Sequence, residues 1–147
     1  PNPTLARRSA GLPRFEPLAA IPGVQLYSLQ VGEEATRQLA ESPLRDTLVD
    51  LAPELRDFRD TAAAIAELDL VLTIDTSVAH LAGALGMPVW VLLMHAADWR
   101  WLLDRADSPW YPSARLYRQP APGEWGPVFE QVRRDLAALA REEAAPR

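Results

Sequence analysis

Residues 70–93 constrain the fold of this chain more than any other part of the sequence. They contain two continuously apolar segments, 70–74 and 89–93, with a short helical pattern at 78–85 between them. Continuously apolar strands are typical of parallel sheets that are covered on both faces. A strand, a helix and a second strand in this order predict a βαβ unit.

The rest of the chain continues this alternation of strands and helices. Further strands are predicted at 24–29, 47–51 and 115–117, and further helices at 15–21, 33–40, 61–68, 99–103 and 125–141. Asp60 or Thr61 would be the N-cap of the helix at 61–68. The sequence therefore predicts an α/β fold, a Rossmann-like parallel sheet with helices on both faces. With 147 residues, 48% of them hydrophobic, residues 1–147 are expected to form a single domain.

Charge, cysteine content and hydropathy exclude several classes of function. The chain has 15 basic and 20 acidic residues and a net charge of -5, so a broad basic face for nucleic acid is not expected. The absence of cysteine excludes disulfides, thiolate zinc sites and cysteine nucleophiles. The apolar runs are too short for a membrane span, and no basic-then-apolar leader is visible, so a cytoplasmic location is expected. No spacing of histidines suits a metal, and neither a metal nor a cofactor is expected.

Polar residues follow the first apolar strand directly, as Asp75, Thr76 and Ser77. Ligands of open parallel sheets bind beyond the carboxyl ends of the strands. If Ser77 caps the next helix, the amides from Val78 to His80 are free, and together with the positive helix end they form an anion site. The Thr76 and Ser77 hydroxyls and the His80 ring would add hydrogen bonds to a phosphate. The alternative is a plain helix cap and a histidine that is hydrogen-bonded within the fold.

Two other strand ends carry candidate residues. Gln30 and Gly32 follow the strand at 24–29, and Gly32 would allow a ligand to approach the backbone closely. Asp57 and Asp60 precede a predicted helix, and either carboxylate could accept hydrogen bonds from ribose hydroxyls. Helix capping and solvation explain this acidic pair equally well.

Residues 98–101 (Asp-Trp-Arg-Trp) place Arg100 between Trp99 and Trp101. An arginine held between two indoles is preorganised for a phosphate or a carboxylate, and an indole face can stack on a base or a sugar ring. Residues 110–112 (Trp-Tyr-Pro) add aromatic surface. The alternative is a hydrophobic cluster that holds a long loop in place.

Four stretches of the chain resemble glycosyltransferase family 9, the heptosyltransferase-like enzymes, in the form found at the carboxyl end of bacterial tetratricopeptide-repeat proteins. The most specific stretch is 75–90, which reads Asp-Thr-Ser-Val-Ala-His-Leu-Ala-Gly-Ala-Leu-Gly-Met-Pro-Val-Trp. The others are residues 27–32, 57–63 and 98–112. The resemblance implies the carboxyl-terminal half of a glycosyltransferase with two Rossmann domains, the half that binds the nucleotide-diphosphate sugar.

The resemblance also implies roles for the candidate residues. The diphosphate would rest on Thr76, Ser77 and Val78, with Asp75 and His80 beside it. The remaining nucleotide-sugar contacts are assigned to Gln30, Gly32, Asp57, Asp60, Trp99 and Arg100.

Enzymes of this family invert the anomeric carbon and use no metal, because helix ends and basic side chains neutralise the leaving diphosphate. The acceptor and the catalytic base would belong to an amino-terminal Rossmann domain, so the isolated chain is expected to be inactive. Tetratricopeptide repeats and a second copy of the chain are further partners left open. The alternative function is a non-catalytic module that keeps the transferase fold for protein contact through its tryptophan-rich loop.

Overall fold

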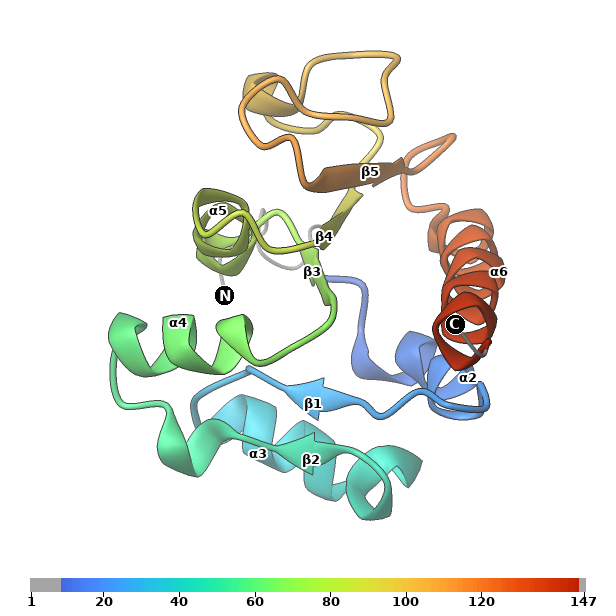
Figure 1. Ribbon diagram of the computed structural model, residues 1–147. Coiled ribbons are helices and arrows are strands. Elements are labelled where there is room, and N and C mark those ends of the chain that lie inside the picture. The colour runs from blue at the N-terminus through green and yellow to red at the C-terminus, as the bar shows by residue number, and fades with distance from the viewer. Residues whose placement is uncertain (1–8, 146–147) are drawn as a thin grey trace. The chain divides into compact units, whose positions relative to one another are not determined.

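The computed structural model describes residues 9–145, which form an α/β structure with parallel strands (Figure 1). The chain divides into two compact units. Among the described residues, the first contains residues 9–10 and Thr61–Val128, and the second contains Gly11–Asp60 and residues 129–145. The predicted fold class, α/β and Rossmann-like, is confirmed. The strands form two sheets, a division that the alternation of elements does not reveal.

A three-stranded parallel sheet forms the centre of the first unit, in the order β3-β4-β5. Its strands are β3 (Val71–Ile74), β4 (Val89–Leu93) and β5 (Ala114–Arg118). All five residues of β4 are buried, as expected of a central strand with continuous apolar sequence. Helix α5 (Ser77–Ala84) connects β3 to β4 and packs on both strands (Figure 1). The βαβ unit predicted from residues 70–93 is therefore present.

Aromatic side chains and an arginine cover part of this sheet. Trp90 of β4 lies opposite Arg115 of β5, and the two rings of Trp90 and Tyr117 are 5.3 Å apart. The Arg115 guanidinium lies 5.0 Å from the Tyr117 ring centroid and 5.7 Å from that of Trp90. This arginine covers apolar rings while its charge stays near solvent.

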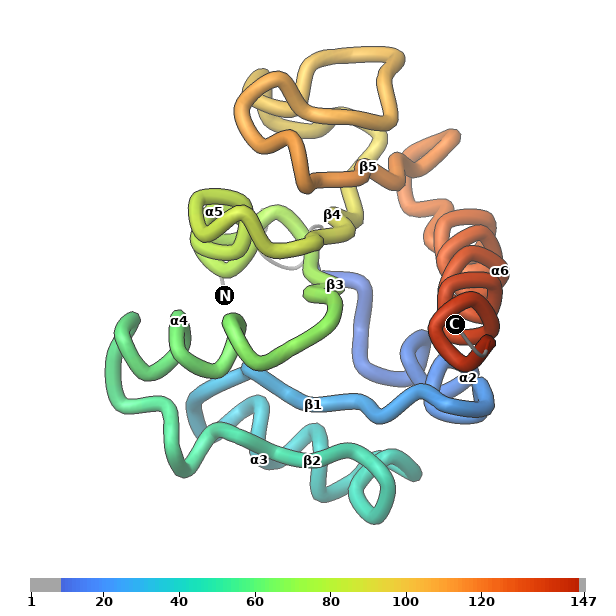
Figure 2. The backbone as a smooth tube through the Cα atoms, in the orientation of Figure 1, coloured from blue at the N-terminus to red at the C-terminus, as the bar shows by residue number. Residues whose placement is uncertain are grey.

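A long connection leads from β4 to β5 and contains one short 3-10 helix, η4 (Trp99–Trp101) (Figure 2). The prediction of a helix over 99–103 is wrong in length because Leu102 has a φ of 53° and a ψ of -163°, which a helix cannot continue. Arg118 donates from Nη2 to the carbonyl of Leu102 at 2.7 Å and to that of Trp101 at 3.2 Å. Partial burial lowers the pKa of Arg118. This arginine therefore holds the strained end of η4 against β5.

The second unit contains a two-stranded parallel sheet of β1 (Tyr27–Ser28) and β2 (Val49–Asp50). The strands predicted at 24–29 and 47–51 are present but much shorter. Side chains bond to the backbone beside them: Gln25 Nε2 donates to the Thr47 carbonyl at 2.8 Å, and Ser28 Oγ accepts from the Gln30 amide at 3.2 Å. The Thr47 carbonyl and the Gln30 amide are therefore bonded to side chains instead of to a neighbouring strand.

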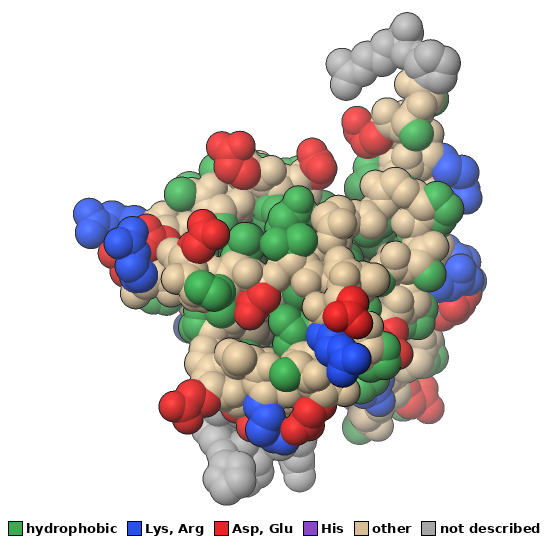
Figure 3. Space-filling view, turned by 90° about the horizontal axis from the view of Figure 1, so that it is seen from below, with side chains coloured by type: hydrophobic (Ala, Val, Ile, Leu, Met, Phe, Trp, Pro, Cys, Tyr) green, Lys and Arg blue, Asp and Glu red, His purple; other side chains and the backbone are tan. Residues whose placement is uncertain are grey.

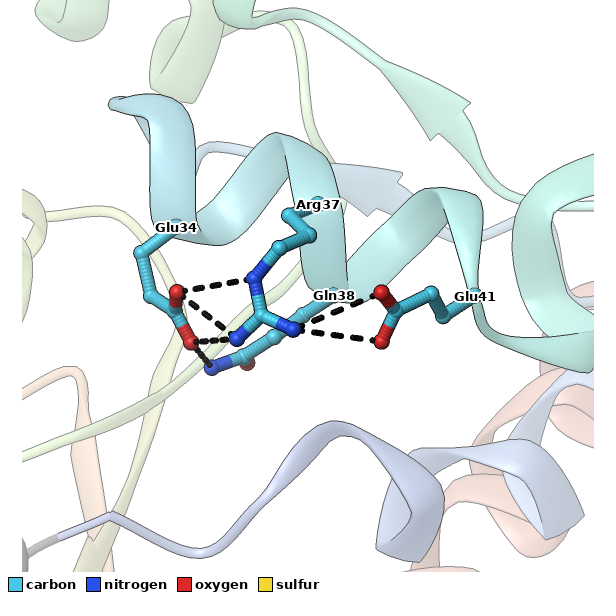
Figure 4. Close-up of polar contacts among 4 residues, drawn as sticks. All are labelled: Glu34, Arg37, Gln38 and Glu41. Carbon is cyan, nitrogen blue, oxygen red and sulfur yellow. Dashed lines mark hydrogen bonds and ion pairs between the residues drawn. The ribbon is translucent and has the colours of Figure 1, made fainter.

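Helix α3 (Glu33–Ala40) has the bounds predicted from its charge order, and Figure 4 shows the ion pairs on its exposed surface. Arg37 Nη2 lies 2.7 Å from Glu34 Oε1, and Arg37 Nη1 lies 3.3 Å from Glu41. The hydrogen bond from Arg37, assisted by one from Gln38, lowers the pKa of Glu34. Pairs at these spacings support a short helix. On the face drawn in Figure 3, acidic side chains (red) and basic side chains (blue) are interspersed.

The remaining helices are η1 (Leu12–Phe15), α2 (Glu16–Ala19), η2 (Pro43–Asp46), η3 (Ala52–Glu54), α4 (Phe58–Ala66) and α6 (Trp125–Ala144). Helix α2 ends before the predicted 21 because Pro22 disfavours helical geometry at Ile21. In the second unit, the rings of Phe15 and Phe129 meet edge to face at 5.0 Å. Within residues 9–145, no helix combines the length and the apolar character that crossing a membrane requires.

Candidate functional site

The turn from β3 into α5 carries the residues that the sequence singled out most strongly. Thr76 is the N-cap of α5, with extended backbone angles (φ -138°, ψ 175°), and the helix begins at Ser77. The prediction that Ser77 caps this helix is therefore wrong by one residue. The Thr76 hydroxyl lies 3.2 Å from that of Thr73 and makes no cap to the helix amides. The turn is thus anchored to β3 through two hydroxyls.

The first-turn amides of α5 are only partly open. Ala79 donates its N–H to the Thr76 carbonyl at 3.0 Å, so the prediction that this amide is free is wrong. The amides of Ser77 and Val78 meet no acceptor within residues 9–145. Two amides at the positive end of the helix are therefore available to an anion.

His80 stands on the first turn of α5 and faces Asp75. Its Nε2 lies 3.9 Å from Asp75 Oδ1, and its Nδ1 lies 3.0 Å from the Tyr111 hydroxyl. The ring stacks on Trp101 at 5.3 Å with an interplanar angle of 21°. The His80 side chain is 37% exposed and that of Asp75 is 15% exposed. A half-open imidazole thus sits beside a largely buried carboxylate, with one nitrogen already bonded within the fold.

Gly83 explains how Tyr111 reaches His80. A Cβ on Gly83 would lie 2.7 Å from Cδ1 of the Tyr111 ring, so only a residue without a side chain leaves room for it. Small residues let α5 lie close to the sheet, and Ala79 and Ala82 are fully buried there. Gly83 has this additional task of accommodating an aromatic ring. Sequence reasoning treated Tyr111 only as aromatic surface.

The segment around Arg100 differs from the prediction of an arginine between two indoles. Arg100 lies over the Trp99 ring at 5.0 Å and pairs with Asp98 at 2.8 Å. Trp99 is 68% exposed, whereas Trp101 is 1% exposed and packs on His80. The tight 3-10 turn directs the two indoles to different sides, because successive residues project about 120° apart. The Arg100 side chain is therefore held in place by Asp98 and Trp99, whereas Trp101 is part of the buried core.

The acidic candidates of the second unit serve the start of α4. Asp57 Oδ1 accepts from the amides of Arg59 at 2.8 Å and Asp60 at 3.1 Å, which makes Asp57 the N-cap, three residues before the earliest predicted one. Asp60 accepts from the amide and from Nε of Arg56, both at 3.0 Å, and these bonds lower its pKa. An open hollow of about 490 Å³ is lined by the side chains of Arg56, Asp57, Arg59 and Asp60. Both carboxylates are thus engaged in local structure.

Gln30 and Gly32 follow β1, in the same unit. The Gln30 side chain is exposed, and Gly32 is the N-cap of α3 with a φ of 104°. This positive φ favours glycine whether or not a ligand approaches. The structure therefore brings Asp75 and His80 together, with Tyr111 and Trp101, in the first unit. Gln30, Gly32, Asp57 and Asp60 lie in the second unit.

Comparison with known proteins identifies the family. The model of glycosyltransferase family 9 (heptosyltransferase) matches residues 23–99, just over half of the chain and from before β1 to η4. Protein FlbA of Caulobacter vibrioides is 34% identical over 146 residues, which cover 93% of this chain and 24% of FlbA. The chain thus spans about a quarter of the length of this relative. No solved structure matches the chain. With its parallel α/β architecture and a family match over half its length, the chain belongs to glycosyltransferase family 9.

Proposed function

We propose that this chain binds the nucleotide-diphosphate sugar that serves as donor in an inverting, metal-independent glycosyl transfer. The observation that carries the proposal is the turn at the carboxyl end of β3. There the amides of Ser77 and Val78 are open at a helix start, and the ring of His80 lies 3.9 Å from Asp75. Amides at a helix start bind phosphate oxygens, an imidazole N–H can donate to one, and a carboxylate accepts from sugar hydroxyls. This combination suits a sugar diphosphate.

Each part of the donor then has candidate contacts. The diphosphate is assigned to the turn from Asp75 to His80, where the hydroxyls of Thr76 and Ser77 lie beside the open amides. Gln30 and either Asp57 or Asp60 are assigned to the nucleoside, with Gly32 allowing close approach to the backbone. Arg100, beside Trp99, is assigned to the phosphates or the sugar. Asp57 and Asp60 would have to bind ribose in addition to their bonds at the start of α4. Residues 1–147 would act as one donor-binding domain.

The same chemistry supports transfer without a metal. A helix start and an arginine such as Arg100 can neutralise the charge that develops on a leaving diphosphate. We propose that the acceptor site and the catalytic base belong to an amino-terminal Rossmann domain, and that tetratricopeptide repeats accompany it. The length of FlbA, of which the chain covers 24%, leaves room for both. On this proposal the isolated chain is inactive. A cytoplasmic location belongs to the proposal as well and is tested by cell fractionation.

Titration calorimetry with ADP and UDP tests the proposal on the protein that contains this chain. The wild type should bind at least one of them, in the presence of EDTA as in its absence. His80→Ala should weaken binding by about 1–3 kcal/mol, because one donor to a charged oxygen is lost. His95→Ala is the matched control. His95 follows β4 and hydrogen-bonds to Gln119, so this variant should bind the nucleotide with the affinity of the wild type. Absence of binding in the wild type, or equal affinity of His80→Ala, would contradict the proposal.

A second candidate function, protein contact without catalysis, is favoured by one observation. Trp99, Leu103 and Trp110 are 68%, 73% and 58% exposed on the connection between β4 and β5. Exposed apolar side chains gathered on one connection are typical of an interaction surface. This candidate predicts that neither ADP nor UDP binds and that Trp99→Ser with Leu103→Ser abolishes self-association in sedimentation analysis.

A further inference from the structure

We propose that Tyr111 is a positioning residue that fixes which nitrogen of His80 carries the proton and faces the ligand. The contact that carries this inference is the 3.0 Å distance between the Tyr111 hydroxyl and Nδ1 of His80. The inference rests on the proposed function, because it assigns His80 a role toward the sugar diphosphate. Tyr111 lies beyond residues 23–99, the part of the chain that the family match covers.

The two neighbours of the imidazole together select one tautomer. A phenol hydroxyl can donate or accept, so Tyr111 alone leaves the choice open. Asp75 Oδ1 lies 3.9 Å from Nε2, on the other side of the ring. A carboxylate attracts an N–H and repels a nitrogen lone pair. The proton is therefore on Nε2, Tyr111 donates to Nδ1, and Nε2–H is the group left to donate to a phosphoryl oxygen.

Stacking on Trp101 cannot replace this contact. The near-parallel stack at 5.3 Å fixes the plane of the His80 ring, and the indole is only 1% exposed. A half-turn of the imidazole about its bond to Cβ keeps the same plane and the same stack, but exchanges the edges of the ring. The hydrogen bond from Tyr111 distinguishes the two orientations, because only one of them brings Nδ1 to the hydroxyl.

Tyr111 is itself held in place by the fold. Its ring packs on the bare backbone of Gly83, where a Cβ would lie 2.7 Å from Cδ1. Its carbonyl accepts from the Ala114 amide at 2.9 Å, and its amide lies 3.4 Å from the hydroxyl of the buried Ser108. A ring fixed from both the helix and the backbone side can hold its hydroxyl at a constant position.

The tautomer can be measured directly, without any ligand. The chain has two histidines, so selective labelling with ¹⁵N-histidine gives ring signals from His80 and His95, and His95→Gln assigns them. In alkaline solution the ¹⁵N shifts of His80 should show protonated Nε2 and unprotonated Nδ1. Protonated Nδ1 in the wild type would overturn the inference, and this readout needs no variant to fold.

Tyr111→Phe tests the positioning role while keeping the ring on Gly83. The variant should show a mixture of His80 tautomers and a loss of affinity for ADP or UDP of about threefold to tenfold, the usual share of one neutral hydrogen bond. Tyr117→Phe, which removes a phenol hydroxyl from β5, is the matched control. It should change neither the His80 tautomer nor the affinity for ADP or UDP. A purely structural role of Tyr111 would lower the melting temperature and leave the tautomer unchanged, which would overturn the inference. If the wild type binds no nucleoside diphosphate, the proposed function fails, and the ¹⁵N shifts still decide the role of Tyr111.

Discussion

Gly83 lies beneath the ring of Tyr111 and leaves no room for a side chain. Gly83→Ala would place a Cβ 2.7 Å from Cδ1 of that ring, so the ring or the helix must move. Overpacking of this kind costs about 1–3 kcal/mol, which outweighs the gain of up to about 1 kcal/mol from the better helix propensity of alanine. We therefore expect urea denaturation to show a lower free energy of unfolding for Gly83→Ala.

Gly126→Ala is the control for this substitution. Gly126 also lies in a helix, α6, but a Cβ there would meet no atom within 4 Å. Alanine has the better helix propensity but is disfavoured in helical geometry directly before Pro127, and the two effects offset each other, so the stability of this variant should stay closer to the wild type than that of Gly83→Ala. If both variants were equally stable, the close contact between Gly83 and Tyr111 would not exist in solution.

At the residue scale, local sequence predicts local neighbours. Asp75 and His80 are five residues apart across a strand-to-helix turn, and the structure places their side chains 3.9 Å apart. Tyr111 is 31 residues from His80, and it reaches the ring only because a long connection folds back over α5. The sequence offered two hints of this contact, the small residue Gly83 on the helix and the aromatic residues at 110–112. A glycine and a distant aromatic residue do not by themselves specify that the two meet.

Asp57 is the side chain that determines where α4 begins. Its carboxylate accepts from the amides of Arg59 and Asp60 at 2.8 and 3.1 Å. Removal of such a cap costs about 0.5–2 kcal/mol. We expect Asp57→Ala to lower the free energy of unfolding by that amount in urea denaturation. Asp57→Asn retains a capping oxygen and loses the charge, so its stability should stay near the wild type. Equal stability of the two variants would show that the cap contributes nothing.

At the element scale, predictions succeed where the determinants lie inside the segment. The continuous apolar run of β4 and the charge order of α3 gave the bounds Val89–Leu93 and Glu33–Ala40. Predictions fail where a neighbouring side chain intervenes. Asp57 starts α4 ahead of the apolar pattern, and the Gln25 amide occupies the Thr47 carbonyl beside β2. Several side chains could make such bonds, and the sequence does not indicate which one does.

At the scale of the whole molecule, the order β3-β4-β5 follows from two successive crossovers and is predictable from the alternation of elements. The separation of β1 and β2 into a second sheet could not be predicted from the sequence, because strand pairing is decided by residues far apart in the chain. The boundaries between the two units also fall at unexpected places, at 60/61 within α4 and at 128/129 within α6.

These boundaries allow a test of the prediction that residues 1–147 form one domain. Gln131 is exposed on α6, close to the boundary at 128/129. Gln131→Pro removes a helix hydrogen bond and kinks the helix, at a cost of about 3 kcal/mol or more. If the chain unfolds as a single cooperative domain, this cost lowers the stability of every element together. Hydrogen exchange followed by mass spectrometry should then show an equal loss of protection in β4 of the first unit and in α3 of the second.

Gln131→Ala controls for the loss of the glutamine side chain, and its exchange should match the wild type because alanine is a strong helix former. Loss of protection confined to the second unit would show that the units unfold separately and that the chain contains two domains.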